Sequence, residues 1–279
     1  MGSVADALRD AARALDGVST SPRLDAELLM AHALGASRSD MLLRHARDDA
    51  PAAFGPFLEQ RLTGKPVSQI TGFHEFYGLP LKVTPDVLTP RPDTETLIEA
   101  AIEAFADRAP ARILDCGTGT GALLLAALSV WPKTQGIGIE RSPAALAVAC
   151  ENAKATGMSN RSVMQAGDWT QDTWRNGLGR FDLVLSNPPY VETHDPDLAP
   201  DVRDHEPAEA LFAGKDGLDD YRILVPVLPE LLAPGGIAVI EIGSRQADAV
   251  TAIGEKSGLS AAMYRDLGNN PRALLFRAA

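Results

Sequence analysis

The chain has 279 residues, of which 45% are hydrophobic and 23% are charged. These proportions are ordinary for a globular protein and exclude wholesale disorder, and the length allows one or two domains. The formal net charge is −11, whereas proteins that bind duplex nucleic acid normally carry a basic footprint. No uncharged stretch is long enough for a membrane helix, and the N-terminus lacks the apolar core of a signal peptide. We therefore expect a cytoplasmic protein that has no direct nucleic-acid or membrane partner.

The cysteines and histidines give no indication of a metal site. The chain contains two cysteines, Cys116 and Cys150, and five histidines. Two thiols do not make a disulfide framework, and no CxxC, HxxxH or HExxH spacing is present. The sequence predicts two reduced thiols and no bound metal.

Residues 1–64 have the pattern of a small helical domain. Val4, Leu8, Ala11 and Leu15 fall on one helical face, and Pro22 stands in the first turn of a second helix. A further helix is expected over residues 51–62. Residues 65–92 differ, because glycines and five prolines separate short apolar pieces. That composition predicts a β-hairpin and linker between two domains.

From residue 93 onward, apolar runs of strand length alternate with helical segments. This alternation predicts an α/β domain over residues 93–279 with a mostly parallel, doubly wound sheet. The expected strands cover residues 112–116, 136–140, 162–166, 181–186, 237–242, 261–266 and 273–277. The expected helices include residues 94–106, 143–156, 221–232 and 246–257.

A glycine-rich motif follows the first of these strands and opens a helix. Its sequence is Gly117-Thr118-Gly119-Thr120-Gly121. Glycines let the backbone approach a ligand, and the helix N-terminus offers free N–H groups. Glu140 stands at the end of the next strand, where a carboxylate can hold both hydroxyls of a ribose. The motif fits NAD and S-adenosylmethionine equally well.

A second motif, Asn187-Pro188-Pro189-Tyr190, comes directly after the strand expected over residues 181–186. Prolines have no N–H group and keep the preceding residue extended. The Asn187 side-chain oxygen and the Pro188 carbonyl could accept the two hydrogens of a planar NH₂ group, while Tyr190 offers a flat wall. Orienting such a weak nucleophile suits methyl transfer to an amide or an exocyclic amine.

Together these two motifs resemble those of amino-group S-adenosylmethionine methyltransferases. Further segments narrow the resemblance to the peptide chain release factor glutamine N5-methyltransferases, the HemK/PrmC family, and they cover nearly the whole chain. They are Pro66–Gly72, Glu75–Gly78, Val87–Glu95, Gly167-Asp168-Trp169, Glu206-Pro207, Leu211–Gly214, Asp216–Leu218 and Glu241–Gly243.

The resemblance implies a Rossmann-like domain with a seven-stranded sheet, preceded by a helical domain (residues 1–64) that recognises the protein substrate. The implied cofactor is S-adenosylmethionine, held by Gly117–Gly121, by Glu140 on the ribose, and by Asp168, Trp169 and Asn187. Asn187, Pro188, Pro189 and Tyr190 would bind the glutamine of a Gly-Gly-Gln motif, with Asn187, Pro188 and Tyr190 as the catalytic group. Pro90-Arg91-Pro92 would line the cofactor pocket. The implied partner is a class I release factor, and we expect a monomer.

Four alternatives remain at this point. The first is methylation of a glutamine in a ribosomal protein, and the second is methylation of a base amine in nucleic acid. The acidic balance and the absence of a basic or aromatic stripe argue against the second. A non-catalytic cofactor-binding module would not need the intact Asn187–Tyr190 motif. An NAD oxidoreductase would need a His, Tyr or Lys constellation that we cannot place near the glycine motif.

Overall fold

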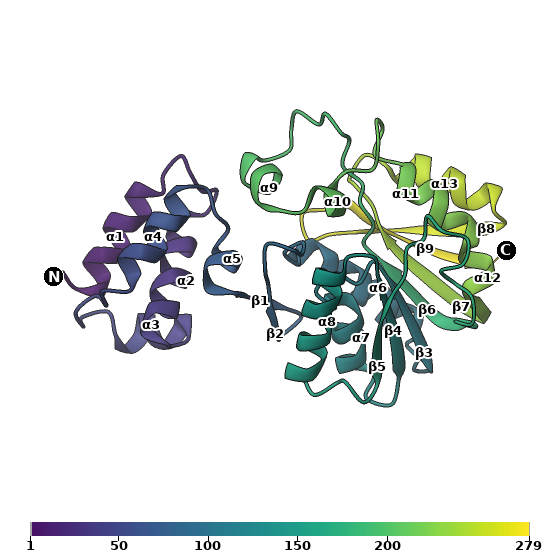
Figure 1. Cartoon of the computed structure of the whole chain (residues 1–279), viewed down its shortest axis with the longest axis horizontal. Helices are drawn as coiled ribbons and strands as arrows, with labels where there is room; N and C mark the ends of the chain where they lie inside the picture. The colour runs from purple at the N-terminus through teal and green to yellow at the C-terminus, as the bar shows by residue number, and fades with distance from the viewer. Residues whose placement is uncertain (1, 279) are drawn as a thin grey trace. The chain divides into compact units, whose positions relative to one another are not determined.

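The computed structural model describes residues 2–278, and the chain divides into two compact units (Figure 1). The first unit contains the residues up to Phe73 together with Ala199–His205, and the second contains His74–Leu198 and the residues from Glu206 onward. The expected helical domain, residues 1–64, falls inside the first unit, and the expected linker is shared between the two. No helix within residues 2–278 is long and apolar enough to cross a membrane.

The first unit is built from short helices around its own apolar core. Ser3 and Ser37 cap two of them by accepting backbone N–H groups, and Gly35 ends another in the left-handed conformation at φ 63°. Its buried core includes Leu8, Leu29 and Met41. The helices are α1 (Val4–Ala14), α2 (Pro22–Leu34), α3 (Arg38–Arg44), α4 (Phe54–Leu62), α5 (Val67–Thr71) and α9 (Pro200–His205).

A two-stranded hairpin, β1 (Phe73–Phe76) and β2 (Leu79–Lys82), follows α5. Tyr77 and Gly78 at its turn both have positive φ, as a tight two-residue hairpin requires. Phe76 and Leu81 are buried in the core of the second unit. The hairpin expected from the linker composition is therefore present.

The second unit contains a seven-stranded sheet with the strand order β5-β4-β3-β6-β7-β9-β8. The first five strands in that order run parallel, and β9 is antiparallel to both of its neighbours. This is the mostly parallel α/β fold that the sequence predicts. The strands are β3 (Arg112–Cys116), β4 (Gln135–Glu140), β5 (Ser162–Ala166), β6 (Phe181–Ser186), β7 (Leu232–Glu241), β8 (Leu259–Arg265) and β9 (Pro271–Ala278).

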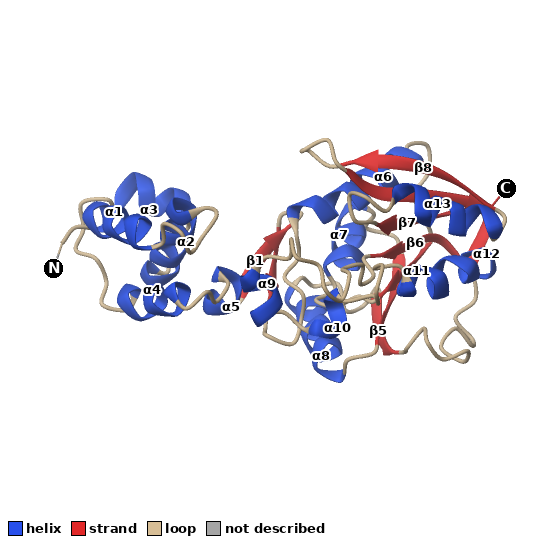
Figure 2. Cartoon of the chain, turned by 90° about the horizontal axis from the view of Figure 1, so that it is seen from above, coloured by secondary structure: helices blue, strands red, loops and turns tan. Residues whose placement is uncertain are grey.

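Helices cover both faces of this sheet (Figures 1 and 2). One face packs against helices that follow or precede the parallel strands, and the other packs against helices from the C-terminal third; each interface has its own buried apolar cluster. The first set is α6 (Glu95–Ala104), α7 (Ala122–Val130) and α8 (Pro143–Ala155), and the second is α11 (Asp219–Leu224), η2 (Val225–Val227), α12 (Leu228–Leu231) and α13 (Ala247–Lys256). Two short helices, η1 (Pro92–Thr94) and α10 (Ala208–Leu211), contribute no residue to either cluster.

The prediction of a single helix over residues 221–232 is wrong. The segment forms three short pieces, α11, η2 and α12, and β7 begins at Leu232 instead of residue 237. Pro226 and Pro229 lie inside the segment and have no N–H group for a continuous helical ladder. The apolar periodicity indicated the buried face correctly but did not reveal these breaks.

The strand order places a topological switch between β3 and β6. From β3 the chain moves outward to β4 and β5, and it then returns to β6 on the opposite side of β3. In open α/β sheets, the crevice at the carboxyl ends of the strands on either side of such a switch is the usual place for a ligand.

Candidate active site

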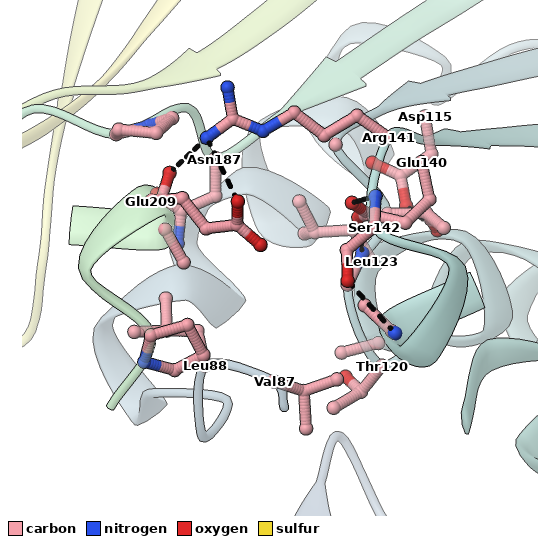
Figure 3. A pocket seen from close by; sticks show the side chains of 18 of the residues that line it. Val87, Leu88, Asp115, Thr120, Leu123, Glu140, Arg141, Ser142, Asn187 and Glu209 are labelled. Carbon is pink, nitrogen blue, oxygen red and sulfur yellow. Dashed lines mark hydrogen bonds and ion pairs between the residues drawn. The ribbon is translucent and has the colours of Figure 1, made fainter. Parts of the chain in front are cut away.

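A pocket of about 930 Å³, measured with its open mouth, lies at this switch (Figure 3). Its walls come from the loops after β3, β4, β5 and β6, from residues 86–90 and from residues 207–210. The lining residues are Asp86, Val87, Leu88, Pro90, Thr94, Asp115, Gly117, Thr118, Gly119, Thr120, Ala122, Leu123, Glu140, Arg141, Ser142, Ala145, Gly167, Asp168, Trp169, Asn187, Pro189, Pro207, Glu209 and Ala210.

The glycine motif forms the loop between β3 and α7. The backbone N–H groups of Gly117 and Thr118 both donate to the Ile139 carbonyl at 2.9 Å, which fixes the loop against β4. Gly117 has a φ of 72°, and a Cβ atom there would lie 2.8 Å from the Trp169 ring. Only glycine fits this left-handed conformation and close approach without strain.

Glu140, at the end of β4, faces the same pocket and is 9% exposed. One carboxylate oxygen accepts the Gly119 N–H and the other accepts the Ser142 N–H, each at 2.9 Å. A carboxylate oxygen has two lone pairs, so each can accept one more hydrogen bond. Glu140 could therefore hold two neighbouring hydroxyls of a ligand.

Asp115, at the C-terminal end of β3, is an unsatisfied acceptor in the pocket wall. Its Oδ2 accepts a hydrogen bond of 2.6 Å from the Thr118 hydroxyl, but its Oδ1 is buried and has no hydrogen-bond partner within residues 2–278. Burial raises the pKa of Asp115 to about 7, and the charge of Glu140 adds to that rise. A cationic or N–H donor on a ligand would satisfy Oδ1.

The remaining pocket wall combines an aromatic ring with aliphatic side chains. Trp169 is fixed by a 2.8 Å hydrogen bond from its Nε1 to Asp220 Oδ1. Asp168 accepts hydrogen bonds from the side chain and the backbone of Thr170, and these lower the pKa of its carboxyl. Val87 and Leu88 line the pocket near one another in Figure 3. A flat, mostly apolar ring system could bind against such a wall.

The Asn-Pro-Pro-Tyr motif contributes unequally to the pocket. Asn187 and Pro189 line it, whereas Pro188, Tyr190 and, from the glycine motif, Gly121 do not. The Asn187 amide nitrogen donates to Thr94 Oγ1 across a long 3.5 Å contact. The Tyr190 hydroxyl donates to Glu241 Oε1 at 3.3 Å, so its ring serves as an anchor for the loop.

Several pocket residues were not identified from the sequence. Arg141 Nη2 donates to the Glu209 carbonyl at 2.8 Å and lies 3.8 Å from its carboxylate, which joins the two walls (Figure 3). Of Pro90-Arg91-Pro92, only Pro90 lines the pocket, while Arg91 pairs with the buried Glu206 at 2.6 Å. For the pocket walls formed by residues 86–90 and 207–210, the sequence offered only the motifs Val87–Glu95 and Glu206-Pro207.

The fold, the glycine loop and the pocket at the switch point define the chain as an α/β methyltransferase. Residues 108–265 match the family model described as "Methyltransferase domain". A solved methyltransferase from Pyrococcus furiosus has the same fold, with a TM-score of 0.51 and 19% identity over 78% of this chain and 95% of its own.

The particular family follows from closer relatives. The chain belongs to the release factor glutamine methyltransferase family. It is 42% identical to the member from Rhodospirillum rubrum over 92% of this chain and 79% of that protein. It is 39% identical to the member from Caulobacter vibrioides over 94% and 92%. Residues 6–72 match the model described as "PrmC N-terminal domain".

Proposed function

We propose that the chain transfers a methyl group from S-adenosylmethionine to the side-chain amide nitrogen, N5, of the glutamine in the Gly-Gly-Gln motif of class I release factors. Membership of the family supports this substrate. The observation that carries the proposal is the orientation of Asn187, whose amide nitrogen contacts Thr94 and whose Oδ1 is the acceptor left for a substrate. The protein would act in the cytoplasm as a monomer, and no nucleic acid would take part in the reaction.

The pocket fits S-adenosylmethionine group by group. Glu140 would accept the two ribose hydroxyls, Trp169 and Asp168 would lie beside the adenine, and Asp115 would accept from the ammonium group of the amino-acid tail. The backbone of Gly117–Gly121 would lie along the ligand. The bound cofactor supplies a methyl group attached to a positively charged sulfur.

The chain's own residues would act mainly by orientation and by electrostatics. The glutamine amide nitrogen is neutral, and its lone pair is delocalised into the carbonyl. Asn187 Oδ1 and the Pro188 carbonyl would accept its two hydrogens and aim the nitrogen at the methyl group. Positive charge that develops on this nitrogen strengthens both hydrogen bonds in the transition state. Tyr190 would keep the loop in place, and the proton would leave to water after transfer.

We assign recognition of the release factor to the helical domain, residues 1–64. All residues that line the pocket within the described chain lie between Asp86 and Ala210. The helical domain is thus free to bind the protein substrate, whereas the second unit holds the cofactor and the reacting amide.

The test is methylation with radiolabelled S-adenosylmethionine and three acceptors offered separately: a class I release factor, ribosomal protein and DNA. We expect label only in the release factor, and none when the glutamine of its Gly-Gly-Gln motif is replaced by alanine. Peptide mass spectrometry would locate the methyl group on that glutamine. Label in the ribosomal protein or in DNA, with an unlabelled release factor, would contradict the proposal.

A further inference from the structure

Three sequence motifs that the proposed mechanism does not use meet behind the Asn-Pro-Pro-Tyr loop. They are Leu211–Gly214, Asp216–Leu218 and Glu241–Gly243. In the sheet, Ser186 of β6 pairs with Ile240 of β7, so the loop after β6 and the segment after β7 leave neighbouring strands at the same edge. The hydrogen bonds described next tie each of the three motifs to the end of this loop.

The side chain of Gln246, the residue before α13, connects two of these motifs to the loop. Its Nε2 donates to the Tyr190 carbonyl at 3.0 Å and to the Gly217 carbonyl at 3.1 Å, and its Oε1 accepts the Gly243 N–H at 2.9 Å. A glutamine amide has two donor hydrogens and one acceptor oxygen. These three partners therefore fix its orientation, because a flipped amide would turn its oxygen toward two carbonyls.

Glycines on both sides leave room for this amide. A Cβ atom at Gly217 would lie 2.3 Å from the Tyr190 carbonyl oxygen and 2.7 Å from Gln246 Nε2, and the φ of Gly217 is 68°. A Cβ atom at Gly243 would lie 2.8 Å from Gln246 Oε1. Only glycine permits such a close approach of the backbone. The glycines of two motifs thus make the space that the Gln246 side chain occupies.

The neighbouring groups at the C-terminal end of the loop are held as well. The Tyr190 hydroxyl donates to Glu241 Oε1 at 3.3 Å. The next residue, Val191, exchanges backbone hydrogen bonds with the remaining motif: its N–H donates to the Leu211 carbonyl at 2.8 Å, and its carbonyl accepts the Ala213 N–H at 2.9 Å. Side-chain and main-chain contacts together fix the end of the loop.

We propose that Gln246 is a positioning residue for methyl transfer, which sets the course of the Asn-Pro-Pro-Tyr loop through the Tyr190 carbonyl. This inference rests on the proposed function, because the loop matters through the two acceptors that it presents, Asn187 Oδ1 and the Pro188 carbonyl. Pro188 and Pro189 have fixed φ angles, so the loop has little freedom to absorb a shift at Tyr190. A misplacement of about 1 Å can cost about 10²-fold in rate. Within residues 2–278, neither Gln246 nor Tyr190 is part of the pocket wall, so Gln246 acts only through the loop.

Enzyme kinetics of Gln246→Met tests this role. Methionine has a similar length but no N–H group for the Tyr190 carbonyl. We expect kcat to fall about tenfold, the effect of one lost hydrogen bond. The KM for the release factor and the Kd for S-adenosylmethionine should stay within about twofold of wild type. A near-wild-type kcat, or a loss confined to cofactor affinity, would overturn the inference.

A double-mutant cycle separates positioning from general destabilisation. In an Asn187→Ala background, Gln246→Met should lower kcat by a smaller factor than in the wild type, because one of the two acceptors that it positions is gone. An equal factor in both backgrounds would show that Gln246 does not act through Asn187 and would count against the proposal.

Gly217→Ala and Gly258→Ala form a matched pair that disturbs the same contact from the main chain. Both glycines have positive φ, 68° and 75°, so alanine strains both and should lower thermal stability in both. Gly217 faces the Tyr190 carbonyl, whereas a Cβ atom at Gly258 meets no heavy atom within 4 Å. We expect a severalfold loss of kcat in Gly217→Ala and none in Gly258→Ala. Equal kcat values in the two variants would contradict the positioning role.

An arm without catalysis separates this inference from the proposed function. In the ¹⁵N-labelled full-length protein, the side-chain NH₂ signals of Asn187 and Gln246 are assigned by their loss in Asn187→Ala and Gln246→Met. The Gln246 signals should exchange with deuterated solvent more slowly than those of an exposed glutamine. The Asn187 signals should shift in Gln246→Met but not in Gly258→Ala. If the wild type methylates no release factor, the proposed function fails while this arm still decides the positioning role. Asn187 signals that stay unchanged in Gln246→Met would overturn it.

Discussion

At the scale of single residues, Asn187 carries the proposed chemistry, and its substitution gives the most direct prediction. Asn187→Ala removes one oriented acceptor and should lower kcat by about 10²–10³, as deletion of one preorganised transition-state hydrogen bond does. Asn187→Asp keeps an acceptor and adds a negative charge that attracts the sulfonium, so it should retain more activity than alanine. Steady-state kinetics with a release factor measures both. A near-wild-type rate for Asn187→Ala would remove the orientation argument.

Glu140 combines two tasks in the structure, because it holds the glycine loop as well as facing the pocket. Glu140→Ala loses the acceptors for Gly119 and Ser142 together with those for a ribose. We expect its Kd for S-adenosylmethionine to rise about 10- to 100-fold, with kcat at saturation less affected. Calorimetry measures the affinity, and Glu140→Gln, which keeps one acceptor, should fall between. An unchanged affinity in Glu140→Ala would mean that the ribose is held elsewhere.

The raised pKa of Asp115 makes the stability of the free protein depend on pH. The carboxyl has an ordinary pKa of 3.8 when unfolded and one of about 7 when folded. Between these values the unfolded chain gives up a proton that the folded chain keeps, so the free energy of unfolding falls as the pH rises. Above about pH 7 the penalty is complete, and for Asp115 it amounts to at most about 4 kcal/mol.

Asp115→Asn should remove this penalty. We expect the variant to gain more stability over the wild type at about pH 8 than at about pH 5, where the native carboxyl is already protonated. Urea unfolding of the cofactor-free protein at the two pH values measures the difference. Cofactor affinity should fall in the same variant, because the acceptor for the ammonium group is weakened. A stability gain of equal size at both pH values would contradict the pKa assignment.

At the scale of elements, the β3–α7 loop depends on close contact with the segment after β5. Gly117→Ala would place its Cβ 2.8 Å from the Trp169 ring and strain a φ of 72°. The matched control is Gly157→Ala, which has a φ of 73° but no heavy atom within 4 Å and lies outside the pocket. We expect both to lose a similar amount of stability from strain. Only Gly117→Ala should also alter tryptophan fluorescence and weaken cofactor binding; identical behaviour of the two would argue against the Trp169 contact.

Elements were predictable from the sequence where a local pattern determines them. The strands β3, β4, β5 and β6 lie within a residue of their expected positions. Three of them, β3, β4 and β6, are largely buried, whereas β5 is a mostly exposed edge strand. The contact between Asn187 and Thr94 was not predictable, since Thr94 lies 93 residues before Asn187 and only the fold brings them together. The Arg141–Glu209 contact was not predictable for the same reason, because the two residues are 68 positions apart along the chain.

At the scale of the whole molecule, the two compact units have separate interiors. The buried apolar cluster of the helical unit runs from Val4 to Phe54, and the buried clusters of the sheet unit begin at Phe76. Each unit also has internal polar ties, such as the 2.7 Å ion pair between Arg61 and Asp25 in the first and the Arg91–Glu206 pair in the second. Because no buried cluster is shared, one unit can be changed while the interior of the other is left intact.

Removal of residues 1–64 therefore tests how the work is divided between the two units. The truncated chain keeps every residue that lines the pocket, so its Kd for S-adenosylmethionine should stay within about twofold of that of the full chain. Its KM for the release factor should rise at least about tenfold, because the surface proposed to recognise the protein substrate is gone. Methylation of a short peptide containing Gly-Gly-Gln, which is too small to use that surface, should change little and provides the internal control. A cooperative thermal transition establishes that the shortened chain is folded before either constant is compared. Parallel loss of cofactor affinity and peptide methylation in a folded truncation would show that the helical domain helps to build the pocket and would contradict the proposed division of labour.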